Sequence, residues 1–381
     1  MQLNKIRNLL TRSTESVCLK CSSRHFQNGF SPKHEIKCLD HLVAALTNNA
    51  IYFDSHILVL NKPYGLKRQH VLSKSPSFIK LNPAAASLDE YSLKDAIPAL
   101  CEIYHTPQLT IVKCPDRYMS GITVLASSDK VAAKFDKCIR CARSEFLFPK
   151  YQAVCVGTPK VREKKHVLGI VMEERKDLNI KDRFNEKRMV FVNTWSKNEV
   201  KRADVSLLRL HHKVLSSTSD ESASLIEVSS NWNRAHCVRT FLAAKLLTPV
   251  LGDHIFSARV KYVFDKPVLG DLWNFDHHMQ YLPAKLKEKL KVRRKGEELT
   301  IPEHIHLSQL TLPGYYRDQQ NLVLTCPISS SSAFQYALNT LELSCEEKAE
   351  SGKGSENRGI AEVGFNINVA EAESIRDQSS V

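Results

Sequence analysis

One stretch of the 381-residue chain decides how the rest is interpreted: Asn233-Arg234-Ala235-His236-Cys237-Val238-Arg239-Thr240-Phe241-Leu242. It opens a segment whose apolar residues recur at the i, i+3, i+4 and i+8 spacing of a packed helix: Val238, Phe241, Leu242 and Leu246. This spacing predicts a helix over residues 236–247, with His236 and Arg239 away from the apolar face. The turn sequence Pro249-Val250-Leu251-Gly252-Asp253 follows the helix.

Short apolar runs between turn residues surround this helix and predict an α+β fold. Residues 51–60 predict a strand, a polar turn and a second strand, and further strands are expected at 109–113, 122–126, 151–156, 190–194, 205–211 and 225–229. Helices are expected at 91–104 and 130–146. The charge-dense stretch 160–188 predicts a loop or a hairpin excursion.

Two more segments carry residues suited to chemistry rather than to a core. The first expected strand pair ends in the turn Asn61-Lys62-Pro63-Tyr64-Gly65. The loop Lys113-Cys114-Pro115-Asp116-Arg117-Tyr118-Met119-Ser120-Gly121 places one carboxylate between two buried strands. Tyr151 opens the strand after the next helix. By itself, a Pro-Asp pair in a loop is most often only a turn former.

Taken together, these segments resemble the signatures of the RluA-type pseudouridine synthases, in order and at similar separations. The family pattern Asn-Lys-Pro-x-Gly matches residues 61–65, and His-Arg-Leu-Asp-x-x-Thr-Ser-Gly matches residues 113–121. Gly-Arg-Thr-His-Gln-Ile-Arg-x-His-Leu matches residues 233–242, Pro-x-x-Gly-Asp matches residues 249–253, and His306 matches a histidine before the final strand. The third signature with its Gly-Asp sequel is specific, whereas the second is degraded.

The resemblance covers about residues 50–330 and implies a fold and an activity. The implied fold is a mixed, largely antiparallel curved sheet flanked by helices, with a central RNA-binding cleft. The implied activity is that of an RNA pseudouridine synthase, an isomerase that detaches uracil from its ribose and rejoins it through C5. The target uridine has to be flipped into the site, because a base inside a helix cannot be reached.

Three residues are implied to be catalytic. The essential aspartate is Asp116, Tyr151 matches the tyrosine that lies against the flipped base, and Arg239 matches the arginine that pairs with the aspartate. A guanidinium within a few Å keeps a buried carboxylate ionised, and a tyrosine ring offers uracil a stacking surface. No metal or organic cofactor is expected.

Eight further residues are predicted to bind RNA: Lys62, Arg117, Arg234, His236, Lys285, Lys289, Arg293 and Arg294. The last four belong to a basic amphipathic segment, residues 284–295, which is otherwise typical of a solvated helix face. Lys62 also suits a structural role, and His236 and Arg234 also suit bracing of the helix start.

The chain departs from the family pattern beside the expected catalytic aspartate. The family His-Arg is Lys113-Cys114 here, Leu is Pro115, Thr is Met119, Gln is Cys237 and the helix His is Phe241. These changes leave open an alternative function, a catalytically silent RNA-binding protein that acts in mitochondrial ribosome assembly or RNA stability.

The net charge agrees with an RNA partner, and the local composition divides the chain into three parts. The net charge is +13, and 43% of the residues are hydrophobic, as in an ordinary globular protein. Residues 1–34 carry six Lys and Arg against one acidic residue, which is typical of a mitochondrial presequence, although a basic arm that contacts nucleic acid has the same composition. Residues 35–343 form the expected catalytic domain, and residues 344–381 an acidic disordered tail. The expected location is the mitochondrial matrix, without a membrane span.

The eleven cysteines are expected to be free thiols. Two Cys-x-x-Cys pairs occur, Cys18/Cys21 and Cys138/Cys141, and the second lies in a helical pattern without a flanking histidine. Structural zinc sites usually have closely spaced ligands on loops, so no metal site is predicted.

Overall fold

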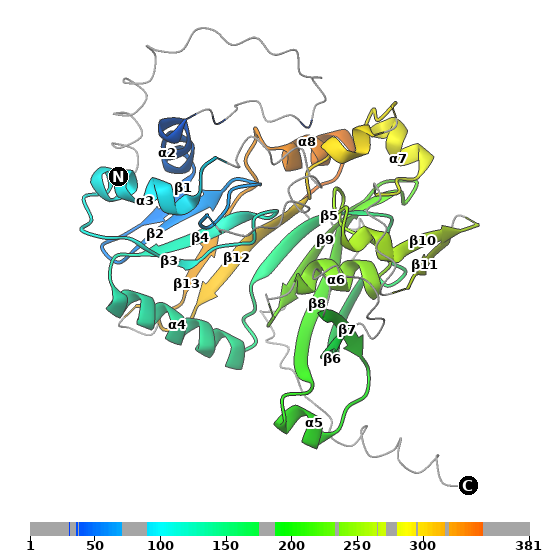
Figure 1. The fold of residues 1–381 in the computed structure, drawn as a ribbon, viewed down its shortest axis with the longest axis horizontal. Coiled ribbons are helices and arrows are strands. Elements are labelled where there is room, and N and C mark those ends of the chain that lie inside the picture. The colour runs from blue at the N-terminus through cyan, green and yellow to red at the C-terminus, as the bar shows by residue number, and fades with distance from the viewer. Residues whose placement is uncertain are drawn as a thin grey trace, which may run out of the picture. The chain divides into compact units, whose positions relative to one another are not determined.

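A computed structural model describes residues 30, 36, 38–70, 90–174, 187–232, 236–264, 266–271, 280–294, 296–316 and 320–345 (Figure 1). The predicted presequence, residues 1–34, lies outside the described residues except for Phe30, and the predicted tail lies outside them after Cys345. Both remain predictions. All described elements belong to the unit Met1–Glu347.

The core of this unit is an eleven-stranded sheet in the order β1-β2-β4-β12-β5-β9-β8-β6-β7, with β3 paired to β4 and β13 paired to β12. Its strands are β1 (Ala50–Phe53), β2 (Ile57–Lys62), β3 (Thr110–Lys113), β4 (Ser120–Ala126), β5 (Lys150–Val156), β6 (Glu163–Glu174), β7 (Lys187–Val192), β8 (Ser206–Ser217), β9 (Ala223–Ser230), β12 (Ile305–Leu312) and β13 (Leu322–Thr325). All pairs are antiparallel except β4 with β12. The mixed, largely antiparallel sheet predicted from the sequence is confirmed.

Helices cover both faces of the sheet, because successive side chains of each strand point to opposite sides. On one face, Tyr151, Ala153 and Cys155 of β5 pack in a cluster with α4 (Asp129–Ser144) and α6 (Cys237–Ala244). We call this the α4/α6 face. Val154 and Val156 of β5 point to the other face, where they pack with α7 (Ala284–Lys289) and α8 (Ala333–Thr340).

The remaining helices and a separate hairpin complete the fold. On the face opposite α4 and α6, Leu58 and Leu60 of β2 pack beneath α2 (Leu39–Asn48) and α3 (Leu93–Ile103). The short helix α5 is Lys197–Lys201, and the 3₁₀ helices are η3 (Phe256–Arg259) and η4 (Glu297–Thr300). Strands β10 (Val260–Val263) and β11 (Lys266–Leu269) form their own two-stranded sheet. No helix among the described residues is long and apolar enough to cross a membrane.

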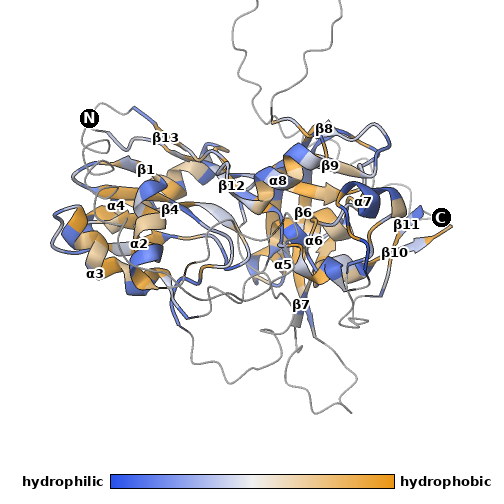
Figure 2. Ribbon diagram, turned by 90° about the horizontal axis from the view of Figure 1, so that it is seen from above, coloured by the Kyte–Doolittle hydropathy of each residue, from blue (hydrophilic) through white to orange (hydrophobic). Residues whose placement is uncertain are grey.

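The expected helix 236–247 exists but is shorter. It ends at Ala244, and Leu247 has a left-handed backbone with φ 57°, which is incompatible with a continuing helix. Similarly, the expected basic segment 284–295 is helical only as far as Lys289, and Lys291 has φ 57°. Figure 2 shows that α7 is strongly hydrophilic. The apolar residues of this segment, Leu282, Leu286 and Leu290, are buried against the core.

Of the two alternatives expected for residues 160–188, a loop or a hairpin excursion, the hairpin is confirmed. Residues Glu163–Glu174 form a long strand that pairs with β8 along eight positions and with β7 in a hairpin. Exposed lysines at 164 and 165 precede Leu168 and Ile170, which are buried in the cluster on the α4/α6 face. The charged residues therefore belong to the exposed start of this strand, and its buried part begins at Leu168.

Candidate active site

Asp116 lies in a tight turn between β3 and β4. The turn is closed by a hydrogen bond from Met119 N to Asp116 O of 3.0 Å. Gly121 follows on β4 with φ +114°, and a Cβ at this position would overlap the backbone oxygen of Leu307 on β12. Only glycine therefore permits the parallel pairing of β4 with β12 at this position, which fixes where the Asp116 turn emerges.

Lys62 holds this turn from beneath. Its Nζ donates hydrogen bonds to the backbone oxygens of Pro63 (3.2 Å), Leu66 (3.0 Å) and Arg117 (3.3 Å). The side chain is completely buried, and burial lowers the pKa of the ammonium group to about 8. The prediction that Lys62 contacts RNA is therefore wrong, and its structural alternative is correct: it braces the carbonyl that follows Asp116.

His236 is the direct partner of Asp116. The imidazole Nδ1 lies 3.3 Å from Asp116 Oδ2, and the two side chains are 43% and 47% exposed, so both remain accessible from solvent. His236 has a left-handed backbone with φ 56° immediately before α6. Thr240 N donates to His236 O at 2.9 Å, which ties the histidine to the first turn of the helix.

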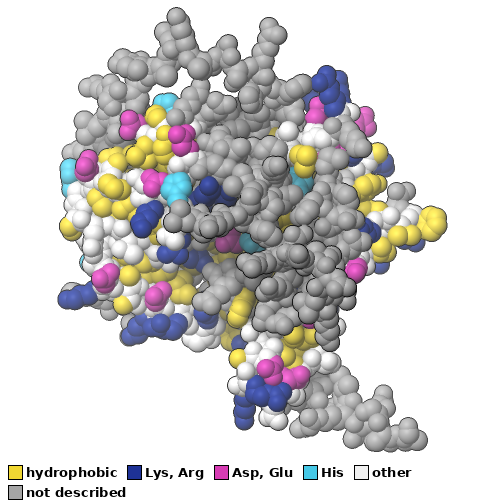
Figure 3. All heavy atoms as spheres, in the orientation of Figure 1, with side chains coloured by type: hydrophobic (Ala, Val, Ile, Leu, Met, Phe, Trp, Pro, Cys, Tyr) yellow, Lys and Arg dark blue, Asp and Glu magenta, His cyan; other side chains and the backbone are white. Residues whose placement is uncertain are grey.

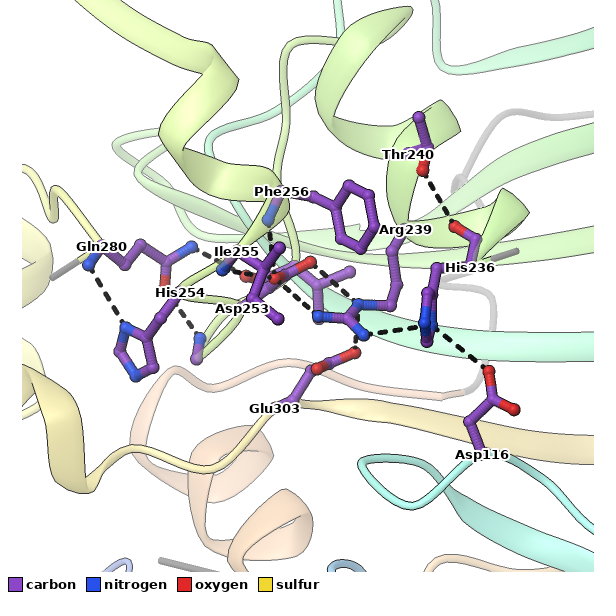
Figure 4. A network of polar contacts seen from close by, with 12 residues as sticks. Asp116, His236, Arg239, Thr240, Asp253, His254, Ile255, Phe256, Gln280 and Glu303 are labelled. Atoms are coloured by element: carbon purple, nitrogen blue, oxygen red, sulfur yellow. Dashed lines mark hydrogen bonds and ion pairs between the residues drawn. The ribbon is translucent and has the colours of Figure 1, made fainter. Parts of the chain in front are cut away.

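Arg239 lies deeper, as Figure 4 shows. Its guanidinium binds Asp253 through Nη2–Oδ1 (2.8 Å) and Nε–Oδ2 (3.0 Å), and its Nε lies 2.7 Å from Glu303 Oε1. All three side chains are buried. The prediction that Arg239 pairs directly with Asp116 is wrong, because the guanidinium points to two buried carboxyl groups and reaches Asp116 only through His236.

The Gly-Asp sequel of the third signature builds the partner of Arg239. Gly252 has φ +82°, and a Cβ would overlap the backbone oxygen of Pro302. Asp253 Oδ1 also accepts hydrogen bonds from the backbone N–H groups of Ile255 and Phe256, each at 3.0 Å. The Phe256 ring then lies over the guanidinium, with its centroid 4.8 Å from Arg239 Cζ.

The carboxyl groups of Asp116 and Glu303 have pKa values that are shifted in opposite directions. For Asp116, burial raises the pKa, but the hydrogen bond with His236 and the positive charges of His236, Arg239 and Lys62 outweigh it and hold the pKa below its usual range. For Glu303, burial dominates and raises the pKa well above its usual range, despite the positive charge of Arg239. The pKa values of the two carboxyl groups are therefore shifted in opposite directions, that of Asp116 downward and that of Glu303 upward.

A small pocket opens beside Asp116 on the α4/α6 face. It is lined by Lys113, Cys114, Pro115, Asp116, Met119, Tyr151, His236, Cys237, Val238 and Leu307. Its volume of about 30 Å³ is the size of one water molecule. The structure thus brings together Asp116, Tyr151 and His236, which come from three separate segments of the sequence.

The buried Tyr151 forms one wall of this pocket. Burial, together with the charge of Asp116, raises the pKa of its hydroxyl well above the usual range. The ring is therefore a neutral surface. Cys237 behaves similarly, because burial raises the pKa of its thiol to about 12. All described cysteines are free thiols, and no group of three His, Cys, Asp or Glu side chains suited to a metal ion occurs among the described residues.

Several predicted RNA contacts lie away from the pocket. Lys285, Lys289, Arg293 and Arg294 lie on or after α7, which packs on the face opposite the pocket. Lys289 Nζ is paired with Asp220 Oδ1 at 2.7 Å. Arg117 lies in the Asp116 turn, where its Nε donates to Gly65 O at 3.3 Å, and Arg234 lies outside the described residues.

Two residues of the site were missed from the sequence. Asp253 belongs to a quoted motif, so its position signalled importance without revealing its partner. Glu303 carried no signal, because a lone glutamate before a strand is usually exposed, and only the fold buries it against Arg239.

Comparisons with known proteins agree with this geometry. The chain is 27% identical over 296 residues to the Bos taurus pseudouridylate synthase RPUSD4, mitochondrial, which covers 75% of this chain and 67% of the relative. It is 25% identical over 306 residues to the Homo sapiens mitochondrial mRNA pseudouridine synthase RPUSD3, which covers 79% of this chain and 78% of the relative. No family model matches. The chain is a homologue of the RluA-type pseudouridine synthases.

The comparison with solved structures concerns the fold. The structure of human RNA pseudouridylate synthase domain containing 4 superposes with a TM-score of 0.57 and 23% sequence identity, covering 81% of this chain and 98% of that one. The pseudouridine synthase fold expected from the sequence is therefore confirmed. The site in this homologue lies where β4, β5 and the start of α6 approach one another.

Proposed function

We propose that this pseudouridine synthase homologue isomerises uridine to pseudouridine in mitochondrial RNA. One observation carries the proposal: an ionised aspartate, Asp116, and a neutral buried tyrosine, Tyr151, line the same pocket although they come from different strands. These are the two residues that the family resemblance assigns to the sugar and to the base. The relatives named above are mitochondrial synthases, which supports the compartment.

The chemistry needs no redox partner. The bond between C1′ and N1 of the uridine breaks, a bond between C1′ and C5 forms, the proton on C5 leaves and N1 gains a proton. Asp116 serves the step at the sugar, and Tyr151 supports the detached uracil. Because the pocket holds only about one water molecule, its walls have to move apart when a flipped base enters.

The cationic surface on the α4/α6 face suits an RNA backbone. Exposed lysines and arginines follow one another along α4: Lys130, Lys134, Lys137, Arg140 and Arg143. Figure 3 shows Lys and Arg side chains over α4. The charge of Arg143 also acts on Lys113, whose side chain lines the pocket. We therefore place the RNA along α4 toward Asp116, with ribosomal or messenger RNA of the organelle as the substrate.

The decisive experiment replaces the carboxylate. Purified wild-type protein and Asp116→Asn are incubated with transcribed mitochondrial ribosomal and messenger RNA, and pseudouridine is counted by mass spectrometry of the digested nucleosides. We expect the wild type to form pseudouridine and Asp116→Asn to form none. Asp40→Asn, at an exposed position of α2, is the matched control and keeps full activity. Equal pseudouridine in RNA treated with wild type and with Asp116→Asn would contradict the proposal.

The alternative function, a silent RNA-binding protein, is supported by the altered segment Lys113-Cys114-Pro115. A rescue experiment separates the two functions. If Asp116→Asn fully restores a knockout cell line while reversal of the charges on α4 does not, RNA binding rather than isomerisation is the function.

A further inference from the structure

The isomerisation requires a proton carrier that the catalytic assignments above do not provide. The C5 proton has to be accepted and N1 has to gain a proton, and the proposed function assigns Asp116 only to the step at the sugar. Tyr151 and Cys237 are poor bases, since burial raises both pKa values, that of Cys237 to about 12. Lys62 is bound to three backbone oxygens beneath the turn.

His236 has the position and the contacts for this task. Its imidazole lines the pocket beside Asp116, and 43% of the side chain is exposed, so a base that enters the pocket can reach it. The Phe256 ring packs beside the imidazole, with a centroid distance of 5.6 Å. An imidazole can both accept and release a proton at its ring nitrogens.

The two contacts of His236 Nδ1 define two protonation states of one atom. Nδ1 lies 3.3 Å from Arg239 Nη1 and 3.3 Å from Asp116 Oδ2. An arginine only donates hydrogen bonds, so Nδ1 accepts one from Arg239 when it carries no proton. A protonated Nδ1 instead donates to the Asp116 carboxylate. Figure 4 shows the imidazole between these two groups.

Charged groups face His236 from several elements. Arg239 faces it from α6, and Asp116 faces it from the β3–β4 turn. The Arg239 charge is itself balanced on the far side by Asp253. Lys113 is a further cation of the pocket lining. The ring thus lies between a cation and an anion.

We propose that His236 is a catalytic proton-transfer residue of the isomerisation. The inference rests on the proposed function and deepens it. After the bond between C1′ and C5 has formed, the C5–H bond breaks, its electron pair restores the double bond of the uracil ring, and the proton moves to Nδ1 of His236. The imidazolium donates a hydrogen bond to Asp116 and then releases its proton, and N1 gains one, so protons balance over the cycle.

The test follows the C5–H bond directly. Transcribed mitochondrial ribosomal and messenger RNA is made with uridine that carries tritium on C5, and tritium release is measured for wild type, His236→Gln and His236→Ala. We expect a loss of roughly 10²-fold in both variants, as for removal of a general base. His41→Gln, at an exposed position of α2, is the matched control and retains the wild-type rate.

Three readouts separate proton transfer from bracing of the helix. Added imidazole restores tritium release to His236→Ala in proportion to its unprotonated fraction, and deuterium on C5 slows His236→Gln more than the wild type. With 5-fluorouridine RNA, which has no proton on C5, both variants still react with the base at the wild-type rate. Far-ultraviolet circular dichroism and the melting temperature show whether each variant is folded.

The outcomes are distinct for the two proposals. No tritium release by the wild type contradicts the proposed function itself. Release by an active wild type combined with unchanged rates in both variants contradicts the role of His236. Equal losses on uridine and 5-fluorouridine RNA, without an isotope effect or rescue by imidazole, also contradict it, because a structural role would produce that pattern.

Discussion

The two walls of the Asp116 pocket are built in opposite ways. The wall contributed by the turn between β3 and β4 carries a half-exposed charge, Asp116, and departs from the family sequence at several positions. The wall contributed by α6 carries a buried ion pair, Arg239 with Asp253, beside the buried carboxyl group of Glu303, and keeps the charged residues of the family motif. The charge that we propose to react is accessible, whereas the ion pair that holds the site is removed from water.

This difference predicts that stability and activity depend on different walls. A buried ion pair with one partner removed leaves an uncompensated charge, which is strongly destabilising. An exposed charge contributes little to stability, because water solvates it in the folded and unfolded states. Three measurements of unfolding test this separation.

The largest effect is expected for the α6 wall. Arg239→Met removes the guanidinium while nearly preserving volume, and it leaves the Asp253 carboxylate buried without its partner. We expect the free energy of unfolding to fall by about 3–5 kcal/mol, measured by urea denaturation at pH 7.5. The double variant Arg239→Met/Asp253→Leu is the control and should recover part of the loss. If Arg239→Met is as stable as the wild type, the ion pair does not support the wall.

An intermediate effect is expected from acid, through two histidines that support one wall each: His304, just before β12, and His306, in β12. His304 Nδ1 lies 3.3 Å from Leu251 O near Asp253, and His306 Nδ1 lies 2.8 Å from Ser120 Oγ at the end of the Asp116 turn. Burial lowers the pKa of each to about 4. The unfolded chain then binds more protons than the folded chain between about pH 6.5 and pH 4.

Stability is therefore expected to fall as the pH decreases through this window, by up to roughly 3 kcal/mol for each histidine. Urea denaturation at pH 7.0, 6.0, 5.0 and 4.5 measures the slope. His306→Gln is less stable at pH 7 but has a shallower pH dependence than the wild type. An unchanged slope in this variant would show that the imidazole is not held neutral in the folded protein.

The smallest effect on stability is expected at Asp116, the proposed catalytic position. Asp116→Asn removes a half-exposed charge whose contact with His236 is 3.3 Å long. We expect its free energy of unfolding to stay within about 1 kcal/mol of the wild type, although pseudouridine formation is lost. A loss as large as that of Arg239→Met would abolish the contrast between the walls.

The same contrast explains what the sequence could predict. The loop position of Asp116, the strand position of Tyr151 and the ranges of most strands could be predicted from apolar periodicity and from the motif resemblance, because turns and alternating strands leave local signals. The partner of Arg239 did not follow, because Asp253 and Glu303 reach it only through tertiary packing. Basic residues at α4 and α7 have similar sequence patterns, and only the fold places α4 on the pocket face and α7 on the opposite face.

The helix α2, the hairpin of β10 and β11, and helix α8 were also missed from the sequence. Each is short, and its apolar residues are buried only by packing against segments that are distant in the sequence. Helix α8, for example, packs against Val154 of β5. Lys62 was assigned to the wrong environment for a related reason: a lysine is rarely fully buried, and its three carbonyl partners come from a turn and from a loop 55 residues away.

The enclosed ammonium group of Lys62 has a consequence for chemical labelling. An amine-reactive reagent requires a free, solvent-accessible nitrogen lone pair, and here the nitrogen is sealed beneath the turn that carries Asp116. Acylation of Lys62 therefore proceeds only when that turn lifts from β2. The rate of modification at this single lysine, followed by peptide mass spectrometry, reports how often the catalytic turn opens.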